Sequence, residues 1–318
     1  MKRIASNIRH FFIQPVPKET LAFFRIAISA FALIQLVVLL PDWMWFYGPA
    51  GLIPWEVSEP LAKTHMPSLG NIQSILSWLH VSANSVVYFV TGTYVLSLVG
   101  LLIGYKTRLM GFLAWLMHGI LNATGHLTAY GVETFTHIAL FYCMVLPVGI
   151  CWSIDSRNKI SRIPGYLVTL SVRLIQLHLC IMYLSCGVEK AMGTQWWNGE
   201  AIWIALQQDQ FHTVNMNWLA NFPLVPKLLC WSTIIIEGLY PMGMMLKKTR
   251  KFWLISILSM HTFIAVFLGL HLFGALMILL NISAFAPILV QYESSKIRGF
   301  ADTYLFRFTR LVKIDGIL

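Results

Sequence analysis

Long apolar segments limit what this sequence can fold into more than any other feature does. Eight segments, each of about 20 residues and so long enough to cross a bilayer as a helix, follow one another along the 318 residues. Only 11% of the residues are charged and 57% are apolar, against roughly 25% charged in a soluble domain. We therefore predict an all-α polytopic membrane bundle. We exclude a soluble enzyme, a nucleic-acid-binding domain and a β-barrel, whose strands alternate polar and apolar residues. The predicted spans lie near residues 20–40, 84–104, 109–128, 132–152, 166–188, 225–245, 252–270 and 272–292.

The positive charges predict the orientation of these spans. With a cytoplasmic N-terminus, 18 of the 23 Lys and Arg residues fall in cytoplasmic segments, three fall outside and two fall within spans. Cytoplasmic loops of membrane proteins carry such an excess. We therefore predict eight spans with both termini in the cytoplasm, in the inner membrane of a bacterium. The net charge of +10 then indicates contact with anionic lipid rather than with nucleic acid.

The spans are predicted to form one transmembrane domain over residues 18–293. A short amphipathic cytoplasmic segment at 1–17 precedes it, and a basic amphipathic tail at 294–318 follows it. The tail mixes aromatic and aliphatic residues with five positive charges, which is typical of a segment held on anionic lipid. Membrane lipid is thus the first partner that the sequence predicts.

Two long outer loops, 41–83 and 191–224, are dense in Trp, Gly and Pro. Two interpretations stay open. The loops either form an aromatic belt at the membrane surface, or they fold into interfacial helices that cover an outward-facing pocket. In the second interpretation Trp196 and Trp197 roof the pocket and Glu200 contributes to it.

Polar residues within the third and fourth spans form a second group of candidates. His118, Asn122 and His126 are spaced by four residues and so share one face of a helix. Glu133 and His137 have the same spacing at the outer start of the next span, which is joined by a short turn. We expect His126, Glu133 and His137 to line a common cavity, although a hydrogen-bonded packing cluster is equally consistent with the pattern. No HExxH motif or paired cysteine is present, so we predict no metal site.

The fifth and sixth spans carry the remaining ionisable groups. Arg173 and Glu237 are predicted to form a structural ion pair, because charges within a bilayer are costly unless paired. Tyr183 opens the polar outer end of the fifth span, and Lys190 closes it. A lysine at the end of an apolar helix either reaches the headgroups or serves as a base in a water-poor site.

Several stretches together resemble one family. Along the predicted spans, the stretches FFRI, FYGPAGL, LNATGHLTAYGVETFTHIALFY, CWSID and YLSCGVEKAMGTQWWNGEAIWIAL follow one another in this order. In this they are similar to the HTTM proteins, the membrane-domain family that includes vitamin K-dependent γ-glutamyl carboxylase. The resemblance covers roughly residues 18–293 and implies a bundle with an outward-facing site.

The resemblance also implies a chemistry. The carboxylase deprotonates a reduced naphthoquinone, which takes up dioxygen and becomes a strong base. That base removes a proton from a glutamyl side chain, which captures carbon dioxide while the quinol leaves as an epoxide. By this resemblance Lys190 corresponds to the family's base and His137 to its transmembrane histidine, so both are expected to be catalytic. The implied cofactors are a vitamin K-like or menaquinol-like naphthoquinol, dioxygen and carbon dioxide.

Two departures from the family pattern make the carboxylation of a glutamyl side chain less secure than the quinol-linked chemistry. The carboxylase has two adjacent lysines where this sequence has Glu189 before Lys190, and it carries a lumenal domain for its substrates that we do not expect here. Three classes of function therefore stay open. They are a quinol-dependent carboxylase or epoxidase, an accessory factor that matures a secreted peptide either by the same chemistry or with a partner subunit, and a transporter.

Overall fold

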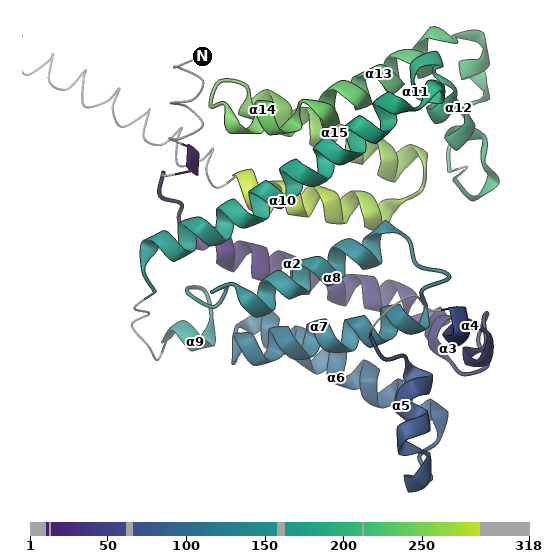
Figure 1. Cartoon of the computed structure of the whole chain (residues 1–318), viewed down its shortest axis with the longest axis vertical. Coiled ribbons are helices and arrows are strands. Elements are labelled where there is room, and N and C mark those ends of the chain that lie inside the picture. The colour runs from purple at the N-terminus through teal and green to yellow at the C-terminus, as the bar shows by residue number, and fades with distance from the viewer. Residues whose placement is uncertain (1–10, 13, 62–65, 158–162, 212, 287–318) are drawn as a thin grey trace, which may run out of the picture.

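The computed structural model describes residues 11, 12, 14–61, 66–157, 163–211 and 213–286. The predicted tail at 294–318 and most of the predicted segment at 1–17 lie outside these residues. All regular structure within them is helical, as predicted (Figure 1). The helices are α2 (Glu19–Leu39), η1 (Leu40–Asp42), α3 (Trp43–Tyr47), α4 (Trp55–Leu61), α5 (Leu69–Leu76), η2 (Ser77–Leu79), α6 (Ala83–Ile103), α7 (Thr107–Thr124), α8 (Gly131–Val145), α9 (Ile154–Arg157), α10 (Gly165–Met192), α11 (Thr194–Asn198), α12 (Glu200–Gln207), η3 (Asp209–Phe211), η4 (Asn217–Asn221), α13 (Leu224–Gly238), α14 (Tyr240–Met245), α15 (Arg250–Phe267) and a last helix at His271–Ala286.

Four helical segments of the described chain are long and apolar enough to cross a membrane. They are Glu19–Tyr47, Ala83–Ile103, Gly165–Met192 and Arg250–Phe267. The other four predicted spans fold as shorter or more polar helices, namely α7, α8, α13 with α14, and His271–Ala286. Both long outer loops contain the short helices that one of the two interpretations required, α3 to α5 in the first and α11 and α12 in the second.

The segment predicted as one span over 225–245 is broken in two, which corrects that prediction. α13 ends at Gly238, and α14 begins at Tyr240 with Pro241 in its first turn. Proline has no backbone N–H to donate to the carbonyl four residues earlier, and its ring crowds that carbonyl. Since that earlier residue is Glu237, the break leaves Glu237 at the end of its helix.

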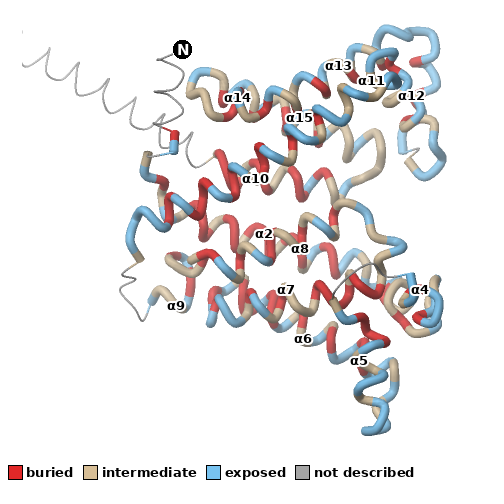
Figure 2. The backbone as a smooth tube through the Cα atoms, in the orientation of Figure 1, coloured by how far each residue is buried: buried red, intermediate tan, exposed pale blue. Residues whose placement is uncertain are grey.

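The helices form two groups that lie next to each other in Figure 1. In the first group α2 packs on α6 and α8, and α7 packs on both α6 and α8. In the second group α10 packs along α13 and α14, while α15 packs on both of these helices. Buried positions run along the facing sides of the helices, and exposed positions cover the ends and the outer helices (Figure 2).

One buried arginine of α2 holds the C-terminal end of α6 and the segment after α8 together. Arg25 is fully buried, and its guanidinium donates to the carbonyls of Leu101 at 2.5 Å, Leu102 at 2.6 Å, Trp152 at 2.5 Å and Val148 at 3.3 Å. The first two are carbonyls in the last turn of α6, where the usual partners four residues later are missing, although Leu101 also accepts the backbone N–H of Gly104 at 3.2 Å. A charge that is costly in an apolar interior is thereby stabilised by helix-end dipoles.

The CWSID stretch has a structural role at the same end. The Asp155 carboxylate accepts hydrogen bonds from the backbone N–H groups of Lys106 and Thr107, both at 2.8 Å, and from the Thr107 hydroxyl at 3.0 Å. These groups open α7, where N–H groups lack intrahelical partners. Asp155 therefore caps α7 across the turn.

Close contact between two glycines positions the second group. A Cβ atom on Gly187 of α10 would lie 2.4 Å from the backbone nitrogen of Gly238 on α13, so only glycine permits this approach. α10 and α13 are antiparallel, and the contact brings the end of α13 beside the end of α10. Glu237 and Lys190 are each close to this crossing point along their own helices.

Candidate functional site

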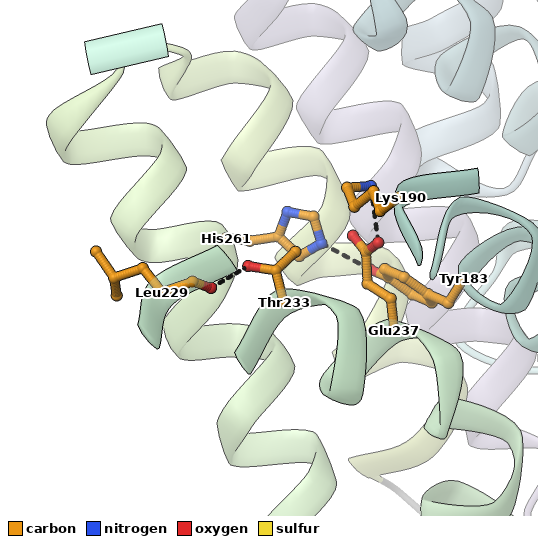
Figure 3. A network of polar contacts seen from close by, with 6 residues as sticks. All are labelled: Tyr183, Lys190, Leu229, Thr233, Glu237 and His261. Carbon is orange, nitrogen blue, oxygen red and sulfur yellow. Dashed lines mark hydrogen bonds and ion pairs between the residues drawn. The ribbon is translucent and has the colours of Figure 1, made fainter. Parts of the chain in front are cut away.

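An ion pair at the end of α10 forms the centre of the first candidate site. Lys190 Nζ lies 2.7 Å from Glu237 Oε2, and the two side chains are 23% and 7% exposed (Figure 3). The ammonium also lies 5.2 Å from the centre of the Trp196 ring. Lys190 is in the last turn of α10, where the helix dipole favours a positive charge. Glu237 is exposed much less than its partner and depends on this contact to balance its charge.

A chain of hydrogen bonds lies next to this pair. Tyr183 Oη is 2.7 Å from His261 Nε2 on α15, and Asn281 Nδ2 is 2.8 Å from the same Tyr183 oxygen. Tyr240 Oη is 2.6 Å from Asn281 Oδ1. Figure 3 shows the Tyr183–His261 contact beside Lys190 and Glu237. Five helices, namely α10, α13, α14, α15 and His271–Ala286, thus bring polar side chains together in an otherwise apolar part of the bundle.

The predicted ion pair between Arg173 and Glu237 is wrong. Glu237 pairs with Lys190 instead, and the Arg173 guanidinium donates to Gln176 Oε1 at 2.7 Å and lies 4.0 Å from the Phe11 ring centre. Arg173 and Lys190 are 17 positions apart on one helix, which corresponds to about 25 Å. Since the glycine contact holds Glu237 at the C-terminal end of α10, Arg173 is too far away to reach it.

The outer aromatic residues cover the site less completely than predicted. Trp196 contacts Lys190, but Trp197 is 50% exposed and donates its Nε1–H to the Ala191 carbonyl at 2.7 Å. Glu200 is exposed at the first residue of α12. The predicted roof over Lys190 is therefore reduced to one indole ring.

The second candidate cluster lies between α7 and α8. The rings of His118 and His137 stack with their centres 5.5 Å apart. Trp115 also stacks on His137, with 5.3 Å between the ring centres. The Nδ1 atoms of both histidines are buried without a hydrogen-bond partner among the described residues. The helical spacing and the short turn predicted this proximity of the two helices correctly.

A pocket opens beside this cluster, lined by residues of α2, α3, α6, α7 and α8. Glu133 in its wall accepts a hydrogen bond from the backbone N–H of Tyr130 at 2.9 Å and lies 3.4 Å from Gln35 Nε2. The lining consists of Ala32, Gln35, Leu36, Leu39, Trp43, Tyr47, Tyr94, His118, Leu121, Asn122 and Glu133. The mixture of aromatic walls with a few polar groups is typical of a ligand pocket.

The lining of this pocket corrects the predicted cavity. Glu133 lines it with His118 and Asn122, whereas His137 stacks on Trp115 outside the lining. His126 Nδ1 lies 3.1 Å from the carbonyl of Ala123, in the turn that ends α7. The prediction of a cavity shared by His126, Glu133 and His137 was therefore wrong in two of its three residues.

The two residues predicted to be catalytic belong to different clusters. Lys190 contacts Glu237 and Trp196 in the second helix group, and His137 contacts Trp115 and His118 in the first. Sequence reasoning missed Asn281, His261 and Tyr240 as members of the Lys190 neighbourhood. A signal was available for Asn281, since a lone amide in an apolar segment is costly unless it is hydrogen-bonded.

Comparison with known proteins assigns the family. The sequence profile of the HTTM domain matches residues 70–287, well over half of the chain. The chain belongs to the HTTM family. This is the vitamin K-dependent carboxylase-like membrane domain, so the resemblance expected from the sequence is confirmed. The FFRI and FYGPAGL stretches precede the matched region.

The HTTM domain contains both candidate clusters, apart from the contribution of α2 and α3 to the pocket. Together with the four apolar helices it identifies the chain as an integral membrane protein. No curated protein matches the chain, and no solved structure matches it either.

Proposed function

We propose that this protein is a membrane enzyme that uses a lipid naphthoquinol and dioxygen to generate a strong base, which acts on a peptide or small substrate. In the proposed enzyme, Lys190 acts as the general base. The observation that carries it is the ion pair between Lys190 and Glu237 at the end of α10, inside a carboxylase-like family domain. Ionisable groups at membrane depth mark functional sites by default.

The side chains around Lys190 can hold and move a proton. An ammonium paired with a carboxylate at 2.7 Å lies within the distance for direct proton transfer. Glu237 can accept the proton from Lys190 Nζ and leave a neutral amine that acts as a base. Trp196 covers the amine, and the exclusion of water strengthens the electrostatic interactions there.

The residues present also fit a reduced naphthoquinone. Such a ring is apolar and carries two oxygen atoms, and the site offers Lys190 together with His261, whose Nδ1 is buried without a partner among the described residues. The bound group would supply the reducing equivalents for dioxygen and the strong base. Carbon dioxide is the proposed second substrate if the enzyme carboxylates its target.

The proposal includes a topology. Eight helical segments cross the membrane, both termini lie in the cytoplasm, and the Lys190 end of α10 faces outward in a bacterial inner membrane. The distribution of Lys and Arg supports it, because 18 of 23 then lie on the cytoplasmic side. A secreted peptide would reach this outer site without crossing the membrane.

Replacement of Lys190 tests the proposal. Lys190→Ala should reduce the oxidation of a reduced naphthoquinone at least 100-fold, the usual loss when a general base is removed. Lys190→Arg should fail as well, because arginine stays protonated. The measurement is quinol absorbance together with oxygen consumption by purified protein in nanodiscs.

A matched control comes from Lys227, which lies 5.2 Å from the Trp231 ring and so resembles Lys190 in its aromatic contact. Lys227→Ala should retain wild-type turnover. Full quinol oxidation in Lys190→Ala would refute the enzymatic assignment, and the accessory role in peptide maturation would take its place.

A further inference from the structure

The orientation of the Asn281 side chain is fixed by its neighbours. Asn281 Nδ2 lies 2.8 Å from the Met277 carbonyl and 2.8 Å from Tyr183 Oη. A backbone carbonyl only accepts hydrogen bonds, so the amide nitrogen and not the amide oxygen must face it. Both N–H groups of the amide are then used, one on Met277 and the other on Tyr183.

The directions of the remaining hydrogen bonds follow. Asn281 Oδ1 only accepts, so Tyr240 donates its hydroxyl proton to it. Tyr183 Oη receives the amide N–H of Asn281, and its remaining neighbour is His261 Nε2 at 2.7 Å. In the arrangement that uses every proton, Tyr183 donates its hydroxyl proton to this nitrogen. An imidazole nitrogen that accepts a hydrogen bond carries no proton. His261 is therefore neutral and protonated at Nδ1.

This leaves one donor of His261 without a partner. Its side chain is 3% exposed, and Nδ1 has no hydrogen-bond partner among the described residues. A buried N–H without an acceptor is costly and is rarely retained unless something else satisfies it. The hydrogen-bond chain from Tyr240 through Asn281 to Tyr183 disfavours the arrangement in which His261 uses its N–H on Tyr183, because the Tyr183 hydroxyl proton would then have no acceptor among the contacts of that oxygen.

We propose that Tyr183 is a positioning residue that holds His261 in the Nδ1–H form, so that His261 keeps this buried N–H for an oxygen atom of the ligand bound beside Lys190. The ligand class is a neutral, lipid-soluble ring with a carbonyl or hydroxyl oxygen. This inference rests on the proposed function for the ligand. The proposed Nδ1–H form of His261 rests on the hydrogen-bond contacts of Tyr183 and not on the ligand.

A second tyrosine–histidine pair provides the control. Tyr142 Oη lies 2.6 Å from His178 Nδ1 in a partly exposed, otherwise apolar pocket between α8 and α10. No hydrogen bond from another described residue fixes the direction of that contact. Tyr142→Phe therefore removes the same chemical group as Tyr183→Phe but should leave His261 unchanged.

The protonation of His261 can be measured by NMR of protein labelled with ¹³C and ¹⁵N in histidine, in nanodiscs and without ligand. His261→Gln identifies the signal by its loss. We expect a single Nδ1–H form in the wild type and in Tyr142→Phe, and a mixture of both neutral forms in Tyr183→Phe. An Nε2–H form in the wild type would overturn the positioning role.

Titration with menadione, a naphthoquinone without a long tail, tests the ligand. We expect menadione to shift the His261 Nδ1 signal, and we expect its affinity to fall about tenfold in Tyr183→Phe, the loss of roughly one hydrogen bond, but not in Tyr142→Phe. If menadione quenches Trp196 fluorescence while the Nδ1 signal stays unchanged, the proposed donor role of His261 is wrong although the site binds quinone. If menadione binds nowhere, the proposed function fails, and the ligand-free spectrum alone decides the role of Tyr183.

Discussion

Removal of one partner of the Lys190–Glu237 pair should destabilise the protein unequally, depending on which partner is removed. Lys190→Met leaves Glu237, whose side chain is only 7% exposed, without a counter-charge. Glu237→Gln leaves Lys190, which is 23% exposed and can turn its flexible stem toward water or headgroups. The first variant should therefore lose more stability than the second, although each removes the same ion pair.

The expected magnitudes follow from the contact. At 2.7 Å, two unit charges attract by about 6 kcal/mol at an effective dielectric constant of about 20, and desolvation of both groups offsets much of this. We expect a loss of roughly 3–4 kcal/mol for Lys190→Met, limited by protonation of the stranded carboxylate, and roughly 1–2 kcal/mol for Glu237→Gln. The double variant leaves no charge behind and should lose only about 1 kcal/mol.

Reversible unfolding in mixed detergent micelles, followed by tryptophan fluorescence, measures the free energy of unfolding of the four proteins. The double-mutant cycle should give a coupling of about 3–5 kcal/mol. Equal losses in the two single variants, or losses that simply add in the double variant, would refute the idea that Glu237 depends on Lys190. Because Lys190→Ala faces the same instability, its activity should be compared at a temperature at which it remains folded.

Three further predictions concern the scaffold and the topology. Arg25→Met leaves four backbone carbonyls without their donor and should cost roughly 3–5 kcal/mol, so an unchanged melting temperature in detergent would contradict its role. Asp155→Ala removes the cap of α7 and should lower the free energy of unfolding by about 1–2 kcal/mol. Asp155→Asn should keep part of the stabilisation by this cap and so lose less in the same assay. A membrane-impermeant maleimide should label Gln210→Cys in intact cells but Lys248→Cys only after the membrane is opened, and the reverse pattern would invert the topology.

The helical architecture could be predicted because length and composition alone limit the structures that an apolar chain can adopt in a bilayer. The polar face formed by His118 and Asn122 was predictable from helical spacing. The short turn predicted that the helices of His118 and His137 are neighbours, but not that these two rings stack. Helical periodicity and loop length are enough to predict which residues share a helix face and which consecutive helices lie side by side.

The partner of Glu237 could not be predicted in the same way. Periodicity says which face of a helix is polar, but not which other helix that face meets. The pairing depends on the close approach of Gly187 to Gly238 and on the helix break at Pro241. The helix break is a local effect of the proline, whereas the glycine contact is an effect of three-dimensional packing, and it brought Glu237 to Lys190 rather than to Arg173.

The presence of a bound quinone tests the central claim most directly. Lipids extracted from the purified protein should be separated and identified by mass spectrometry, with an unrelated membrane protein purified from the same cells as the control. We expect a naphthoquinone or its epoxide at close to one molecule per protein, and less of it in His261→Gln. Only phospholipid, or quinone at the level of the control protein, would contradict it.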